Sequence, residues 1–385
     1  MRIAIVHSYY RSQFPSGENT CVDAQFGALA EAGHTVALLS RHTDSERTLT
    51  AYPARAAVRV ITGRGPDPTS RLAEFRPDVV HIHNQFPNIG TNWVDRWPGP
   101  IVHTLHNFRP LCANGLLFRD GSTCTACPDG SPLSAVVHRC YQDSAVASIP
   151  LTVRNSRGIS HDRLLARSDA LLVLSELARD IFGRYGLAAE KMRIVPNGLA
   201  EFGGPRDGAP IGPRWLSVGR LSAEKGFKEL AEIWPSDIRL DIYGDGPERD
   251  SIAAIAPPSV QLRGLMGRTE LRQRMSGYTG LIFPSRWFEM SPYTVIEALE
   301  AGLPVVALEG SSGAETVRQK RVGDIYRDRE SLVTAMNSVV GQGLALRRHC
   351  LDTYEKEFSI DAWVRALESV YEEARDKRGT GISTS

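Results

Sequence analysis

The chain has 385 residues, which exceeds the length of one ordinary folding domain, so we expect two domains. Hydrophobic residues make up 42% of the chain and charged residues 23%, as in globular proteins, and no apolar run is long enough to span a membrane. The net charge of +1 gives no reason to expect nucleic acid as a partner. The segment Met1–His7 is too short for a signal sequence, lacks a small-residue cleavage site, and reads as a buried strand. We expect a cytoplasmic protein whose only membrane contact is peripheral, at the inner face of the cell membrane.

Short β-branched runs alternate with helical stretches along the first half of the chain. The spacing between most of these runs leaves room for a crossover helix, which predicts a parallel sheet covered on both faces. The runs are Ile3–Val6, Thr35–Leu39, Val79–His83, Ile101–Leu105 and Leu171–Leu174. The same alternation of strand-like and helical segments occurs again in the second half of the chain. Its strand-like runs are Trp215–Val218, Ile238–Tyr243, Val260–Arg263, Gly280–Phe283 and Pro304–Leu308. The sequence therefore predicts an α/β fold with two doubly wound, Rossmann-like domains.

Glycine and proline dominate residues 203–213, which predicts a linker at 201–214 between domains at 1–200 and 215–358. The first domain carries a cysteine-bearing insertion at about 108–145. A last helix is predicted at 359–375, followed by a frayed tail at 376–385. Arg220, Glu289 and His106 are all predicted at the carboxyl ends of strands, where a ligand cleft between two such domains is expected.

Two glutamates, Glu289 and Glu297, are separated by a segment that contains Pro292. Proline interrupts a regular helix, so we expect Glu289 in a loop and Glu297 at the start of the following helix. There the Glu297 carboxylate would either bind a ligand or only interact with the helix dipole.

Two cations, Arg220 and Lys225, follow the strand-like run that ends at Val218. Alone, Lys225 reads as a surface lysine. Because Arg220 follows Gly219 and Lys225 precedes another glycine, both side chains can point into one cleft and neutralise a diphosphate.

Further ligand candidates lie at strand ends or in the segments that follow them. Gly17 precedes a helix expected from Thr20, where backbone amides could meet an anion, although from the residues alone a simple turn is the better-supported reading. His106 follows an apolar strand, and a histidine there is commonly just a polar group at a loop. His83 and Asn84 end another strand and either line an acceptor site, together with Asn107, or pack at the strand end.

These motifs resemble those of the retaining glycosyltransferases of family 4, which have the two-domain GT-B fold, and the resemblance covers most of the chain. It implies that Arg220 and Lys225 hold the donor diphosphate, Glu289 the sugar hydroxyls and Glu297 the ribose hydroxyls. It also implies that the last helix returns to the first domain and that His106 lies beside the donor sugar and the reacting centre.

The resemblance implies further donor contacts. They are Gly17 beside the phosphates, Gly219, Gly244 and Gly246 near the diphosphate, and Met266 near the base. The loops of Gly246 and Met266 also read as strand-ending turns. The family usually has glycine after its first glutamate, whereas this chain has Met290 and Ser291 before Pro292, so we expect donor choice to depend on this segment.

By resemblance, a hexose-type sugar moves with retention from a UDP- or GDP-sugar to a hydroxyl acceptor, with no metal at the diphosphate. The acceptor would be a glycan, a lipid-linked glycan or a small molecule, in polysaccharide or lipid-linked glycan assembly. Alternatives are natural-product glycosylation, a nucleotide-sugar epimerase of the same fold, and a zinc-stabilised module that binds nucleic acid. The absence of a basic stripe argues against the last.

Four cysteines lie within the insertion, in a pattern where an outer cysteine flanks a Cys-x-x-Cys pair on each side. This pattern is typical of tetrahedral zinc coordination, and the surrounding residues have little capacity to form a core. We expect a structural zinc on Cys112, Cys124, Cys127 and Cys140, and no cofactor for catalysis. The alternative is four reduced, unrelated thiols.

A basic stretch follows the insertion. A solvated helix face or contact with anionic lipid headgroups would explain it. Its members are Arg154, Arg157, His161, Arg163 and Arg167.

Overall fold

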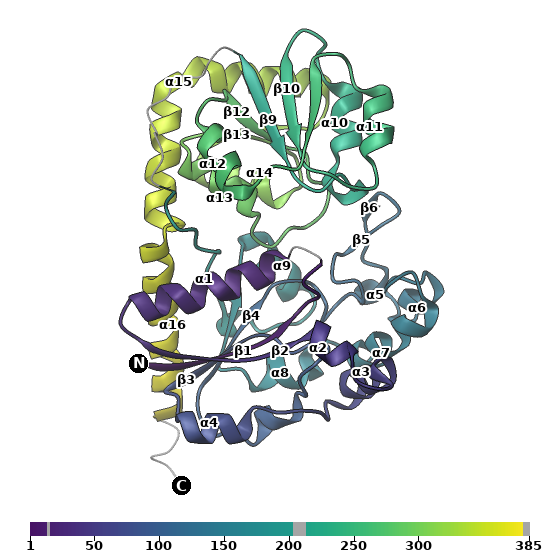
Figure 1. Ribbon diagram of the computed structural model, residues 1–385, viewed down its shortest axis with the longest axis vertical. Helices are drawn as coiled ribbons and strands as arrows, with labels where there is room; N and C mark the ends of the chain where they lie inside the picture. Colours follow the sequence, from purple (N-terminus) through teal and green to yellow (C-terminus); the bar gives the residue numbers. More distant parts are fainter. Residues whose placement is uncertain (14–15, 203–212, 380–385) are drawn as a thin grey trace. The chain divides into compact units, whose positions relative to one another are not determined.

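The structure is a computed structural model that describes residues 1–13, 16–202 and 213–379. The chain divides into two compact units (Figure 1). The first comprises Met1–Leu117, Cys124–Gly198 and the chain from Trp363 onward, and the second comprises Phe118–Thr123 and Leu199–Ala362. Most of the expected linker falls on residues 203–212, outside the described residues.

The first unit is built on a six-stranded parallel sheet, in the order β2-β1-β3-β4-β7-β8. Its central strands are apolar because helices cover both faces of a parallel sheet, and Ile3, Ile5 and Ile82 are fully buried. The bounds are β1 (Arg2–Tyr9), β2 (Thr35–His42), β3 (Val79–Asn84), β4 (Ile101–Leu105), β7 (Ala170–Val173) and β8 (Met192–Ile194).

Ten α-helices are described in or entering this unit. They are α1 (Gly17–Glu31), α2 (Thr43–Arg47), α3 (Tyr52–Thr62), α4 (Thr69–Phe75), α5 (Ala126–Asp129), α6 (Ser134–Val137), α7 (Ala145–Asn155), α8 (Arg163–Arg167), α9 (Glu176–Arg184) and α16 (Ile360–Gly379). Single 3₁₀ turns occur at η1 (Asn92–Asp95), η2 (Ile159–His161) and η3 (Ala189–Lys191).

Two helix ends differ from the sequence prediction. Helix α1 begins at Gly17, three residues before Thr20, because the Ser16 hydroxyl caps it by accepting a hydrogen bond from the Asn19 amide at 3.3 Å. Helix α16 continues to Gly379, where we expected a frayed tail from residue 376. Its last turn is held in place because Arg378 donates to Asp169 at 2.8 Å.

The second unit repeats the architecture, with a six-stranded parallel sheet in the order β11-β10-β9-β12-β13-β14. Its strands are β9 (Arg214–Val218), β10 (Arg239–Tyr243), β11 (Val260–Gly264), β12 (Gly280–Phe283), β13 (Val305–Leu308) and β14 (Gly323–Tyr326). Its helices are η4 (Ala223–Lys225), α10 (Phe227–Ile233), α11 (Arg249–Ile255), α12 (Arg268–Met275), α13 (Tyr293–Glu300), α14 (Ser312–Lys320) and α15 (Arg329–Glu357). The antiparallel pair β5 (Phe118–Arg119) and β6 (Ser122–Thr123) also belongs to this unit.

The helix that carries Glu297 begins earlier than expected. Helix α13 starts at Tyr293 with Pro292 at its N-cap, so Glu297 lies in the middle of the helix. Proline fits this position because it needs no backbone hydrogen bond there. The expectation that Glu297 opens the helix was therefore wrong, and interaction with the helix N-terminus does not account for this residue.

None of the helices in the described part of the chain is both long enough and apolar enough to cross a membrane.

Candidate functional site

In the second unit, the loops that follow β9 and β10 are packed backbone against backbone. The Leu221 amide donates to the Asp245 carbonyl at 3.0 Å, and the Gly219 amide donates to the Tyr243 carbonyl at 3.0 Å. At Gly244 φ is +143°, and a Cβ there would lie 1.8 Å from the Gly219 carbonyl oxygen. Only glycine permits this close approach. Gly244 therefore allows the loop after β10, which is predicted to bind the sugar donor, to pack against Gly219.

Lys225 and Glu289 meet although they are far apart in the sequence. The Lys225 Nζ donates to Glu289 Oε1 at 2.7 Å, and the Ser285 hydroxyl donates to the same oxygen at 2.7 Å. The Glu289 side chain is 11% exposed and lies in the loop after β12, as predicted, while Lys225 also lies over the Trp287 ring at 5.5 Å. Two residues that were both predicted to bind the nucleotide-sugar donor therefore form an ion pair with each other.

Arg220 differs from Lys225 in that it is exposed at the end of the β9 loop. Among the described residues its guanidinium has no ion-pair partner within 4.0 Å. Such a cation is available to an anionic ligand without first breaking a protein contact.

The segment after Glu289 turns inward. Met290 is buried, Ser291 is half-buried, and Pro292 is buried at the N-cap of α13. The buried Met290 side chain therefore packs inside the unit directly after Glu289.

Glu297 is almost completely buried, at 7% side-chain exposure, and is paired with Arg268 at 2.5 Å. Burial raises the pKa of the Glu297 carboxyl, and the Arg268 guanidinium opposes this rise. Arg268 also lies over the Tyr293 ring, 5.0 Å from its centroid. Met266 lies in the loop after β11, where its side chain is half-buried against the hydrophobic core of the unit.

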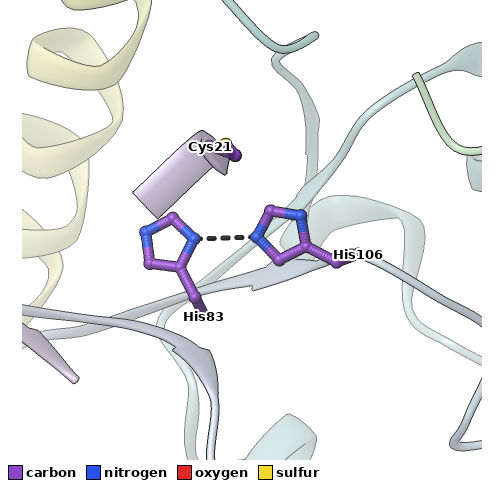
Figure 2. Close-up of side chains that lie close together, drawn as sticks. All are labelled: Cys21, His83 and His106. Atoms are coloured by element: carbon purple, nitrogen blue, oxygen red, sulfur yellow. Dashed lines mark hydrogen bonds between the residues drawn. The ribbon is translucent and has the colours of Figure 1, made fainter. Parts of the chain in front are cut away.

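In the first unit, three histidines are stacked along the ends of β3 and β4. The rings of His81 and His83 are 4.3 Å apart and those of His83 and His106 are 5.1 Å apart. Figure 2 shows the hydrogen bond that joins His83 Nδ1 and His106 Nε2, which measures 2.8 Å. His81 is tied to helix α16 through the Tyr371 hydroxyl at 2.7 Å and to β4 through Thr104 at 2.7 Å.

The stacked histidines are neutral at pH 7. Burial, followed by the charges of neighbouring histidines, lowers the pKa of His83 and of His106 well below the ordinary value. A neutral His106 can donate or accept a hydrogen bond, but it provides no positive charge.

Cys21 lies next to this pair (Figure 2). The donor atoms of Cys21, His83 and His106 all lie within 4.8 Å of one another. Their packing needs no ion, because the Cys21 thiol donates to Asn197 Oδ1 at 3.2 Å and the two imidazoles bond each other.

Sequence reasoning missed Glu18, in the first turn of α1. Its Oε2 accepts hydrogen bonds from the Tyr10 hydroxyl at 3.3 Å and from Asn107 Nδ2 at 3.2 Å. Burial raises the pKa of Glu18 to about 7, against the effect of Arg109. The signal was a glutamate directly after Gly17, at the start of the helix that follows the first strand.

A cavity of about 270 Å³ lies in the first unit, and it collects all the residues predicted for the acceptor side. His83, Asn84, His106 and Asn107 line it. Five arginines also line it, with Asp162 as the one acidic residue of the lining: Arg59, Arg109, Arg154, Arg157 and Arg163. Three of them are ion-paired, Arg59 with Glu46, Arg154 with Asp162 and Arg163 with Asp95.

The four cysteines of the insertion lie near one another. Burial, and then the neighbouring Cys112, Cys140 and Cys124, raises the pKa of the Cys127 thiol to about 11. In the described part of the chain, no three of their sulfurs lie within 4.8 Å of one another. The zinc therefore stays a prediction. Cys21 and Cys350 are both buried.

Two family models match this sequence in succession. Residues 15–200 match Glycosyltransferase Family 4, and residues 212–342 match Glycosyl transferases group 1.

Several curated proteins have sequences similar to this chain. The chain is 26% identical to a GDP-mannose-dependent alpha-mannosyltransferase of Corynebacterium glutamicum and 22% identical to an alpha-monoglucosyldiacylglycerol synthase of Streptococcus pneumoniae, covering 97% of this chain and 86% of the relative in each case. It is 28% identical to an exopolysaccharide phosphotransferase of Streptomyces coelicolor over 58% of this chain, but it spans only 25% of that relative.

Solved structures share the fold. Anabaena HepE in complex with UDP matches with a TM-score of 0.60 and 13% identity, over 97% of this chain and 100% of that one. Sucrose-phosphate synthase from Thermosynechococcus elongatus matches with a TM-score of 0.64 and 16% identity, over 97% and 98%.

Proposed function

Because this chain belongs to the family 4 glycosyltransferases and has their GT-B fold, we propose that it transfers a hexose-type sugar, with retention, from a UDP- or GDP-sugar. The acceptor is a hydroxyl in polysaccharide or lipid-linked glycan assembly. The observation that carries this proposal is the pairing of Lys225 with Glu289, which puts a cation for phosphate and a carboxylate for sugar hydroxyls at one place.

The chemical demand of the reaction is charge stabilisation. As the bond between the sugar and the diphosphate breaks, negative charge grows on the leaving oxygen and positive charge on the sugar ring. Arg220 and Lys225 stabilise the leaving diphosphate, which speeds the step because they bind the developing charge better than the ground state. The acceptor attacks on the same face, its hydroxyl proton passes to the leaving oxygen, and no metal is used at the diphosphate.

The ion pair between Lys225 and Glu289 gives donor binding a specific consequence. Lys225 holds Glu289 in place at 2.7 Å, with Ser285 as a second donor. When the diphosphate arrives, Lys225 moves part of its interaction to phosphate, which frees lone pairs of Glu289 for the sugar hydroxyls. Glu289 orients the sugar and is not a covalent nucleophile.

Two other residues have supporting roles. Glu297, on the side of the nucleotide, accepts from the ribose hydroxyls while Arg268 balances its charge. His106 acts as a neutral hydrogen-bonding group beside the sugar, a role supported by its bond to His83.

We also propose that a structural zinc binds Cys112, Cys124, Cys127 and Cys140. The proximity of the four thiols supports this site, because metal ligation would supply folding free energy to the insertion. Four thiolates leave no open position, so the metal stabilises the insertion and takes no part in catalysis.

A panel of UDP- and GDP-sugars tests the main proposal, with binding followed by thermal shift and donor consumption followed with and without acceptor. We expect one donor to raise the melting temperature and to be hydrolysed slowly without acceptor. Isomerisation of the donor sugar would instead identify an epimerase. Binding to duplex or single-stranded nucleic acid without any nucleotide-sugar binding would indicate the nucleic-acid module.

A further inference from the structure

The loops that follow β9 and β12 are held together by their main chains as well as by side chains. At Gly226 φ is +71°, and a Cβ there would lie 2.2 Å from the Pro284 carbonyl oxygen. The Arg286 amide also donates to the Glu224 carbonyl at 2.9 Å. Lys225 lies between Glu224 and Gly226, so these main-chain contacts bring it beside the residues that follow Arg286.

Trp287, directly after Arg286, contacts the Lys225 side chain. The Lys225 ammonium lies 5.5 Å from the centroid of the Trp287 ring, within the range of cation–π attraction, which is strongest for tryptophan among the aromatic side chains. The Glu289 amide donates to the Trp287 carbonyl at 3.0 Å, so the ring and the Glu289 carboxylate belong to one tight turn. Lys225 therefore has two partners in this turn, a carboxylate at 2.7 Å and an aromatic ring.

The Trp287 side chain interacts through its ring and not through its polar atom. Its indole nitrogen is buried and has no hydrogen-bond partner in the part of the chain that the structure describes. An indole N–H can only donate, and leaving it buried and unpaired lowers stability. Hydrogen bonding therefore does not explain a tryptophan at this position, whereas contact with Lys225 does.

The ring contact matters because a lysine side chain is flexible. An ammonium on a long alkyl chain loses conformational entropy when a ligand holds it in one position. The Lys225 side chain is only 23% exposed, so part of that freedom is already lost before a ligand binds. A cation that is held in place beforehand binds an anion more tightly than one that must first be ordered.

We propose that Trp287 is a positioning residue of the donor site, whose ring holds the Lys225 ammonium where it contacts both Glu289 and the donor diphosphate. The inference rests on the proposed function, because it takes Lys225 as a diphosphate ligand. Glu289 is assigned to the sugar, and the sugar is bonded to the β-phosphate, so the phosphate nearest to Lys225 is the β-phosphate. Trp287 therefore acts on binding of the β-phosphate and not on binding of the nucleoside or its first phosphate.

Calorimetry with nucleotides tests this role without any acceptor. UDP, GDP and the monophosphates UMP and GMP are titrated into the whole chain, and the nucleoside diphosphate that binds more tightly is compared with its monophosphate. Trp287→Leu should weaken binding of the diphosphate about fivefold or more and binding of the monophosphate less than about twofold. Trp287→Phe retains an aromatic face, so its loss of diphosphate binding should be only about twofold. Equal losses for the two nucleotides would show a merely structural role, and Trp287→Phe binding as weakly as Trp287→Leu would exclude the ring contact.

A double-mutant cycle tests whether Trp287 acts through Lys225. Lys225→Ala removes the ammonium, so adding Trp287→Leu to it should change diphosphate binding less than about twofold. A further loss of about fivefold in the double variant would overturn the proposal, because Trp287 would then act independently of Lys225.

A change confined to the electrons of the ring provides the same test if the leucine variant does not fold. Tetrafluorotryptophan at position 287 nearly preserves the shape of the side chain but withdraws electron density from its face. It should weaken diphosphate binding when Lys225 is present and leave binding unchanged in Lys225→Ala. Unchanged binding with Lys225 present would refute the cation–π contact.

A matched control comes from the first unit, where the Arg184 guanidinium also lies 5.5 Å from the centroid of an aromatic ring, that of Tyr185. Tyr185→Leu removes a ring from a cation outside the donor site, so we expect it to bind both nucleotides as the wild type does. A loss of diphosphate binding as large as that of Trp287→Leu would overturn the proposal. Wild-type protein that binds neither nucleoside diphosphate would refute the proposed function together with this inference, whereas wild-type binding that Trp287→Leu leaves unchanged would refute this inference alone.

Discussion

Acidification should destabilise the first unit through its buried histidines. Burial lowers the pKa of His7 and of His103 to about 4 and that of His81 to about 3, from 6.5. As the pH falls, these histidines take up protons in the unfolded chain before they do so in the folded protein. Their contribution to the free energy of unfolding is therefore fully present above pH 6.5 and is lost as the pH drops toward 4. When the pH falls from 7.5 to 5.5, each histidine lowers the free energy of unfolding by about 1.4 kcal/mol, and the three together lower it by about 4 kcal/mol.

One buried acid acts in the opposite direction. The pKa of Glu18 is raised to about 7 in the folded state from 4.5, so its stabilising effect is present at low pH and is lost as pH rises through 7. When the pH falls from 7.5 to 5.5, this carboxyl raises the free energy of unfolding by about 2 kcal/mol. The net loss is thus about 2 kcal/mol, and His83 and His106, whose pKa values are also lowered, increase it.

Amide hydrogen exchange measures this loss unit by unit, because protection in strands reports the local free energy of opening. After correction for the intrinsic exchange rate, the free energy of opening measured for peptides of β1, β3 and β4 should fall by about 2 kcal/mol or more between pH 7.5 and 5.5. Peptides of β9, β10 and β12 provide the control, since His349 is the only histidine of the second unit and is exposed. His81→Asn should reduce the pH-dependent loss by about 1.4 kcal/mol. Equal losses in the two units would refute the reasoning.

Three further outcomes are expected. Arg220→Ala or Lys225→Ala should lower turnover at saturating donor by about 10² or more, whereas Lys228→Ala should change it less than threefold; a similarly small effect at the first two positions would exclude the diphosphate role. Gly244→Ala should lower stability in urea by about 2 kcal/mol or more, because its Cβ would meet the Gly219 carbonyl, and an unchanged midpoint would contradict this contact. Protein purified without chelator should contain one zinc per chain, and metal well below that with four freely titrating thiols would exclude the site at Cys112, Cys124, Cys127 and Cys140.

The sequence predicted the central strands better than the edge strands. Runs such as Ile101–Leu105 coincide with strands because a central parallel strand is buried on both faces and must be apolar. Strands β8 and β14 were missed, and both lie at sheet edges. Strand β8 has only three residues and contains Arg193, while β14 is mostly half-buried and contains Asp324, so neither has the apolar pattern that prediction relies on.

The candidate site was predictable where spacing along the chain determines chemistry, and not where packing determines it. Glu289 fell in a loop as predicted because proline follows it, but the helix of Glu297 began earlier because Pro292 serves as its N-cap. The pairing of Lys225 with Glu289 depends on how β9 and β12 are placed in the sheet, which no local pattern reveals.

The two predicted carboxylates of the donor site are held in different ways, and this difference bears on their roles. Glu289 is bound by Lys225 and Ser285, and Lys225 is itself a predicted diphosphate ligand, so under the proposed function the environment of Glu289 changes when a donor binds. Glu297 is paired with Arg268, a residue outside the predicted diphosphate ligands, and is almost completely buried. The carboxylate assigned to the sugar that moves is therefore coupled to the leaving group, while the one assigned to the nucleotide is fixed independently of it.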